Sequence, residues 1–122
     1  MTARTQIVGQ RGECIAEDHL TSLGARVLSR NYRADFGEID LVLEHEGDLV
    51  AVEVKARGVA DLEQPEEAVT WSQLRRIARA LAAFALDTDR LEEPWRIDVV
   101  AISFAADGSV HSLDHLRSVY PG

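Results

Sequence analysis

Residues 38–57 have the sequence EIDLVLEHEGDLVAVEVKAR, in which apolar and polar residues alternate on both sides of Glu46-Gly47. This pattern is typical of an antiparallel β-hairpin with a two-residue turn. Such a turn pairs residues whose numbers add up to 93, so that apolar residues face apolar residues, as Leu41 faces Val52. We therefore expect strands over 38–44 and 49–57. Alternation places Ile39, Leu41 and Leu43 on one face of the first strand.

The polar face of this hairpin carries the chemistry. The same register brings Asp40 opposite Glu53, with Lys55 two residues further along. Like charges that face each other on neighbouring strands are destabilising, so this pair calls for a cation. Mg²⁺ binds one or two carboxylates, keeps waters and phosphate oxygens, and lowers the pKa of a bound water. The alternative is a solvated sheet face with a Glu53–Lys55 ion pair worth less than about 1 kcal/mol.

Lys55 is unusual in this chain, because the other 12 of its 13 basic residues are arginines. Arginine and lysine differ in geometry, in hydration and in how readily their pKa shifts. A compact ammonium group suits the orientation or deprotonation of a water, or the stabilisation of charge on a phosphodiester. The single lysine therefore favours the site over the solvated face.

Hydrophobic periodicity predicts the remaining elements. Helices are expected over 5–23, with Gly24 as the C-cap, and over 65–86, and further strands over 25–32, 95–104 and 110–116. The order of helix, three strands, helix and one or two strands predicts an α/β sandwich with a mixed sheet. Gly9 and Gly12 each cost up to about 1 kcal/mol inside a helix, so they indicate a late helix start or a close approach of the backbone.

Length and composition restrict the class of protein. We expect residues 1–122 to form one domain, and a single cysteine excludes an internal disulfide. With no apolar stretch near the roughly 20 residues of a membrane span and no secretory signal, we expect a cytoplasmic protein without membrane contact. The net charge of −8 disfavours nucleic acid, but residues 61–67 and 87–93 carry −7 of it, so a local basic surface remains open.

Other noticeable residues are expected to be structural. Asp98 on an inner strand needs a partner if it is buried, and Arg96 shares its face; support of the Asp40–Glu53 site is the alternative. We expect Cys14, Trp71, Phe84, Trp95 and Phe104 to be structural or core residues, and His19, His45, His111 and His115 to lie on the surface.

Five spaced motifs carry a family resemblance. They are Gly9-x-x-Gly12-Glu13-x-x-Ala16-Glu17, Asn31-Tyr32-Arg33, Gly37-Glu38-Ile39-Asp40-Leu41, Glu53-Val54-Lys55-x-Arg57 and Arg96-x-Asp98-Val99-Val100. In these motifs nearly the full chain resembles the YraN-like family of small bacterial proteins. That family is related to archaeal Holliday-junction resolvases, and the Asp…Glu-x-Lys set resembles the signature of the PD-(D/E)XK nuclease superfamily.

The resemblance implies a restriction-endonuclease-like αβββαβ core and assigns roles to matching positions. Asp40 and Glu53 would hold Mg²⁺ or Mn²⁺, with the carbonyl of Val54 as a third ligand. Lys55 would position the attacking water, and Glu13 on the first helix would face the metal site.

The resemblance also implies a substrate. Family members often carry a lysine near the start of the second long helix, where this chain has Gln73, Arg75 and Arg76. With Arg33 and Arg57, these are the expected nucleic-acid contacts. We expect an endonuclease that hydrolyses DNA, branched or otherwise structured, in repair or recombination, with weak or structure-specific binding. A homodimer is compatible with a junction that has two strands to cut. The alternative is a catalytically silent nuclease-fold module that binds nucleic acid or a protein.

Overall fold

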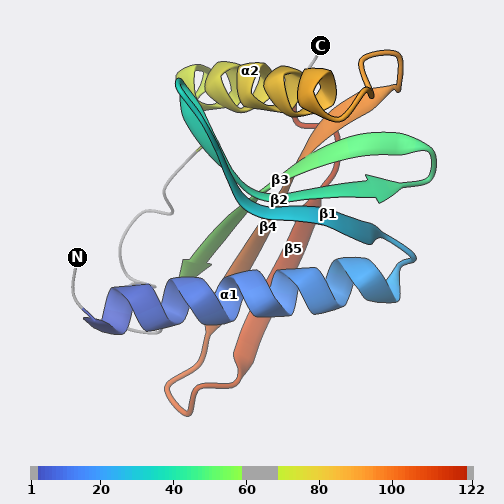
Figure 1. Ribbon diagram of the computed structural model, residues 1–122. Coiled ribbons are helices and arrows are strands. Elements are labelled where there is room, and N and C mark those ends of the chain that lie inside the picture. The colour runs from blue at the N-terminus through green and yellow to red at the C-terminus, as the bar shows by residue number, and fades with distance from the viewer. Residues whose placement is uncertain (1–2, 59–68, 121–122) are drawn as a thin grey trace.

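A computed structural model describes residues 3–58 and 69–120, and of residues 3–6 only the backbone. The elements are α1 (Ala3–Ser22), β1 (Arg26–Ala34), β2 (Gly37–His45), β3 (Asp48–Arg57), α2 (Trp71–Asp87), β4 (Trp95–Phe104) and β5 (Val110–Leu116). The strands form one sheet in the order β1-β2-β3-β4-β5, parallel only between β3 and β4. Figure 1 shows α1 and α2 on opposite sides of this sheet. The fold is the predicted mixed α/β, restriction-endonuclease-like core.

The helix ends follow from local hydrogen bonds. Gly24 has φ +96°, and the N–H groups of Gly24 and Ala25 donate to the carbonyls of Thr21 and Leu20, at 3.0 and 3.1 Å. This is a Schellman motif, so the predicted C-cap is confirmed. Within the described residues, neither helix is long and apolar enough to cross a membrane.

The second helix begins later than predicted. It starts at Trp71, because the Thr70 hydroxyl accepts from the Gln73 N–H at 3.1 Å and the Gln73 side chain accepts from the Thr70 N–H at 2.8 Å. This capping box satisfies two N–H groups that a helix start leaves free. A helix from Pro65 would include residues 69 and 70, and these two are not helical, so this part of the prediction is wrong. Residues 65–68 lie outside the described part.

The hairpin register is confirmed near the turn and fails at the site. Glu46 and Gly47 both have positive φ, at 54° and 83°, as a two-residue hairpin turn requires. Leu41 pairs with Val52 as predicted, but this is the last pair between β2 and β3. The predicted pairing of Asp40 with Glu53 is therefore wrong. Figure 1 shows the β1–β2 hairpin leaving the sheet towards α2.

The departure goes with a change of face between the residues on either side of Asp40. Ile39 packs in the core on the α2 side, whereas Leu41 packs in the core on the α1 side, so the expectation that both share one face is wrong. Asn31 lies between the β1 residues that pair with Ile39 and Leu41, and its φ is 51°. A left-handed residue at this point bends the hairpin. We call the place where β2 leaves β3 the fork.

The first helix lies close to β3 at one of its two glycines. A Cβ on Gly12 would come within 2.6 Å of the Ala56 Cβ, whereas a Cβ on Gly9 would meet nothing within 4 Å. The predicted close approach is confirmed for Gly12 and wrong for Gly9. Because Gly12 allows this contact, α1 also brings the neighbouring Glu13 towards the fork.

Candidate metal and nucleic-acid site

Asp40 occupies the fork between β2 and β3. Its Oδ2 accepts a hydrogen bond of 2.7 Å from the main-chain N–H of Val54. On β3, Glu53 Oε1 lies 3.8 Å from Lys55 Nζ, and these two side chains are only 21% and 22% exposed. The ion pair of the solvated-face alternative is thus present, but its side chains are largely withdrawn from water.

The carboxylates at the fork influence one another. Burial raises the pKa of Glu53 to about 7, and the charge of Asp40 adds to this effect. Burial also raises the pKa of Asp40, although the Val54 N–H opposes the shift. The pKa of Glu13 is raised by burial and then by the charges of Asp40 and Glu38. Three elements therefore bring the predicted residues Glu13, Asp40, Glu53 and Lys55 together.

Glu38 belongs to this cluster and was not among the predicted site residues. Its charge raises the pKa of Glu13, Asp40 and Glu53. Glu38 and Glu53 also line the same pocket. The spacing of two residues between Glu38 and Asp40 on one strand was the signal that could have identified it.

The donor set at the fork fits a hard cation with few protein ligands. In the described part of the chain, no group of three or more His, Cys, Asp or Glu side chains is arranged to hold a metal ion. Two carboxylates withdrawn from water, with raised pKa values, nevertheless suit Mg²⁺, which takes one or two carboxylates and completes its shell with water and phosphate. The Val54 carbonyl remains a predicted third ligand.

Three arginines of α2 are exposed. Among the described residues, Arg75, Arg76 and Arg79 have no carboxylate partner. By contrast, ion pairs with acids are formed by Arg26, Arg30, Arg33, Arg90, Arg96 and Arg117, among others. Surface arginines without acidic partners favour binding of an anion, such as a phosphate.

The other predicted nucleic-acid contacts differ in their surroundings. Arg33 is exposed and lies 3.8 Å from Glu38. Arg57 is half-buried, and its Nε donates to Ser103 Oγ at 3.4 Å. Gln73 caps α2 and also lines the pocket that contains Glu53. None of these contacts tests nucleic-acid binding, which stays a prediction for all three.

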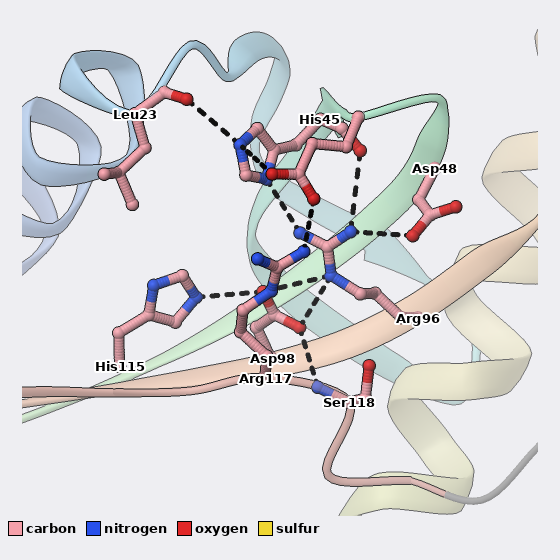
Figure 2. A network of polar contacts seen from close by, with 9 residues as sticks. Leu23, His45, Asp48, Arg96, Asp98, His115, Arg117 and Ser118 are labelled. Atoms are coloured by element: carbon pink, nitrogen blue, oxygen red, sulfur yellow. Dashed lines mark hydrogen bonds and ion pairs between the residues drawn. The ribbon is translucent and has the colours of Figure 1, made fainter.

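Asp98 has a structural environment of its own (Figure 2). Its carboxylate is fully buried and accepts from Arg96 Nε at 3.1 Å and from the Ser118 N–H at 3.0 Å, and it lies 2.9 Å from His115 Nε2. Arg96 also contacts Asp48 at 2.7 Å and His45 Nδ1 at 2.9 Å. The expected Arg96 partner is confirmed, and none of these contacts involves Asp40, Glu53 or Lys55.

Several side-chain expectations are corrected here. His45 is buried and His115 is half-buried rather than on the surface, because their ring nitrogens join the Asp98 network. Trp71 and Trp95 are 57% and 43% exposed rather than core, because each begins an element and has Tyr120 as its ring neighbour. Cys14 is exposed, His19 is half-buried, and the core positions of Phe84 and Phe104 are confirmed.

The strand order and the acidic fork define a restriction-endonuclease-like domain. The sequence matches the model of the Uncharacterised protein family UPF0102 over residues 12–102. The chain belongs to this family, also called YraN, within the restriction-endonuclease-like superfamily.

Curated relatives match over most of their length. The UPF0102 protein of Roseiflexus castenholzii is 39% identical over 117 residues, which cover 95% of this chain and 94% of the relative. The Rhodococcus jostii protein is 38% identical over 119 residues, covering 97% and 99%. A relative from Shewanella sp. (strain W3-18-1) is 44% identical over 96 residues, covering 79% and 88%.

Proposed function

We propose that this protein is a divalent-metal-dependent nuclease that hydrolyses phosphodiester bonds in DNA. The observation that carries the proposal is the meeting of the Asp40 and Glu53 side chains at the fork. There Glu53 Oε1 lies 3.8 Å from Lys55 Nζ. Two half-buried carboxylates, of which Asp40 raises the pKa of Glu53, are costly for a folded protein unless a cation relieves them. A site of this kind therefore has a functional rather than a stabilising explanation.

Each residue at the fork has a distinct task. Asp40 and Glu53, with the Val54 carbonyl, would hold Mg²⁺ or Mn²⁺, which when bound activates a water and neutralises charge on the phosphodiester. The Val54 N–H fixes the orientation of Asp40 before any ligand arrives. Lys55 Nζ donates hydrogen bonds to the attacking water or to the phosphodiester oxygen on which charge develops.

The α2 arginines supply the DNA-binding surface in this proposal. Arg76 lines the same pocket as Glu53, and Arg75 lies beside it on the exposed face of the helix. Basic side chains on phosphates provide most of the affinity for DNA, so binding is expected to weaken as salt rises. The resemblance to junction resolvases suggests branched DNA in repair or recombination, and two copies of the chain would then cut the two strands.

A silent DNA-binding module is the second candidate. It is favoured by the lack of a side-chain group of three metal donors in the described residues. In this case the fork would only carry the nuclease fold, and the α2 arginines would do the binding.

One panel of cleavage assays distinguishes the nuclease from the silent module. Duplex, flap, single-stranded and four-way DNA are incubated with Mn²⁺ and the wild-type chain, or with Asp40→Asn, Glu53→Gln or Lys55→Ala. We expect cleavage that each substitution lowers by about 100-fold or more. Asp114→Asn, an exposed acid on β5, is the matched control.

Equal residual cleavage in all three variants would identify a contaminating nuclease and overturn the proposal. Calorimetry that shows no Mg²⁺ or Mn²⁺ binding, together with intact junction binding in a gel shift, would establish the silent module instead.

A further inference from the structure

A pocket of about 410 Å³ lies between the β1–β2 turn and α2. Its lining includes Phe36, Glu38 and Glu53 on the strand side and Gln73 and Arg76 on the helix side. The pocket therefore runs from the fork to the arginine-rich face of α2. Its volume is in the range of small-molecule sites and leaves room for one nucleotide.

A flat cationic group lies over the ring of Phe36, one of the residues that line this pocket. The guanidinium carbon of Arg79 lies 4.5 Å from the centroid of the Phe36 ring. The ring itself packs against the core on the α2 side, so it is anchored. Arg79 is exposed and, among the described residues, has no carboxylate partner. Nucleobases stack on aromatic rings and on arginine planes, with about 1–3 kcal/mol per base for aromatic stacking.

The wall between these two ends is fixed by backbone packing. A Cβ on Gly37 would lie only 3.3 Å from the Cβ of Arg76, so the hairpin turn and α2 are in close contact there. Figure 1 shows the tip of the β1–β2 hairpin beside α2. This contact holds the stem of Arg76 at the wall of the pocket that Glu53 and Phe36 also line.

The opposite side of the fork is unsuited to phosphate. A second pocket, of about 470 Å³, is lined by Glu13, Glu17 and Asp18 of α1. Its one arginine, Arg30, is committed to Glu17 through two hydrogen bonds of 2.6 and 2.8 Å. Of these three acids only Glu17 is neutralised by an arginine, so this pocket repels a phosphate chain. A nucleic-acid backbone is therefore expected to approach the fork from the α2 side.

We propose that the α2-side pocket binds one unpaired nucleotide directly beside the phosphodiester to be cut, with its base stacked on the Arg79–Phe36 pair. This inference rests on the proposed nuclease function and specifies its substrate class as DNA with an unpaired nucleotide at the cut. A base that stays paired within a continuous duplex cannot enter the pocket, because it must first leave the stack.

Fluorescence of 2-aminopurine tests the stacking. The analogue is placed at each position in turn of a short single-stranded DNA, which is bound to the Lys55→Ala chain with Mn²⁺ and to the wild-type chain in EDTA. We expect a fluorescence change at one position only, next to the bond that the wild-type chain cuts. Arg79→Ala should remove this change and weaken binding about 5- to 100-fold.

Two further variants separate stacking from simple charge. Arg75→Ala removes the same charge from the same helix, at a residue that stacks on no ring of the described part of the chain, and should keep the position-specific change. Arg79→Lys keeps the charge but not the plane, and should lose it. Equal effects of Arg75→Ala and Arg79→Ala, with rescue by Arg79→Lys, would show a phosphate contact and overturn the stacking.

The outcomes also separate this inference from the nuclease proposal. Metal-dependent cleavage within continuous duplex, at the rate seen for flap or single-stranded DNA, would overturn the unpaired-nucleotide pocket and leave the nuclease. A position-specific change that Arg79→Lys abolishes, without cleavage of any DNA, would support the pocket and overturn hydrolysis. Failure to bind any of these DNAs would overturn both.

Discussion

The main-chain N–H of Val54 donates a 2.7 Å hydrogen bond to the carboxylate of Asp40. The last pair between β2 and β3 is Leu41 with Val52, so beyond it the Val54 amide has a side chain as its partner instead of a β2 carbonyl. A half-buried amide without a partner is costly, and this bond satisfies it. The same contact that ends the ladder therefore also fixes the carboxylate at the fork.

The first prediction concerns stability against pH in the absence of metal. Burial and the charge of Asp40 raise the pKa of Glu53 to about 7, from an ordinary value of 4.5. Between these values the folded chain keeps a proton that the unfolded chain has released, so the free energy of unfolding falls as pH rises through this window. We expect a loss on the order of 2 kcal/mol, measured by urea unfolding in EDTA at about pH 5 and about pH 8.

Glu53→Gln provides the control for this effect. The variant has no proton to lose at this position, so its unfolding free energy should depend less on pH over the same window. Mn²⁺ at about pH 8 should stabilise the wild-type chain, because the ion binds the folded state alone. Identical pH dependence of the two chains would show that Glu53 titrates normally.

The second prediction compares two glycines in one helix. Gly12→Ala should destabilise the fold by about 1–3 kcal/mol, because the added Cβ meets the Ala56 Cβ at 2.6 Å and α1 must move. Gly9→Ala should stabilise by up to about 1 kcal/mol, because nothing lies within 4 Å and alanine favours the helix. Chemical denaturation of both variants measures the difference. Equal effects of the same sign would contradict the packing of α1 on β3.

Local chemistry made much of this structure predictable. Glu46 and Gly47 supply a turn with two positive φ angles, and that turn fixed the pairing of Leu41 with Val52. The Gly24 cap and the apolar face of α2 are also local signals. The start of α2 was missed because Thr70 and Gln73 cap each other at a point that hydrophobic periodicity does not mark.

The fork depends on contacts distant in sequence and could not be predicted from alternation. Ile39 turns to the α2 core only because the hairpin kinks at Asn31 and packs on a helix that begins at Trp71. For this reason the Asp40–Glu53 pairing was wrong although the two side chains do meet. Glu38 lies two residues before Asp40 on the same strand, so alternation could have placed it in the cluster, whereas His45 and His115 depend on partners from other strands.

The third prediction separates the Asp98 network from the fork. Asp98→Asn leaves Arg96 buried with one acid fewer and should cost about 3 kcal/mol of unfolding free energy. Metal affinity of the folded variant should stay at the wild-type value, since none of the Asp98 contacts reaches Asp40 or Glu53. Asp114→Asn, an exposed acid, is the control and should change stability by less than about 0.5 kcal/mol. Weakened Mn²⁺ binding at unchanged stability would instead assign Asp98 to the site.

The last prediction asks whether the fork needs an amine or only a positive charge. Lys55→Arg keeps the ion pair with Glu53 but replaces a compact, rotatable donor with a wide planar one in a space that leaves Lys55 only 22% exposed. We expect cleavage to fall about 100-fold or more, while Mn²⁺ binding by calorimetry changes only a few-fold, because both carboxylates remain. Arg26→Lys makes the reverse exchange at an exposed ion pair with Glu44 and should cleave like the wild type. Wild-type cleavage by Lys55→Arg would mean that the chain's single lysine serves Glu53 as a counter-charge and takes no part in positioning water.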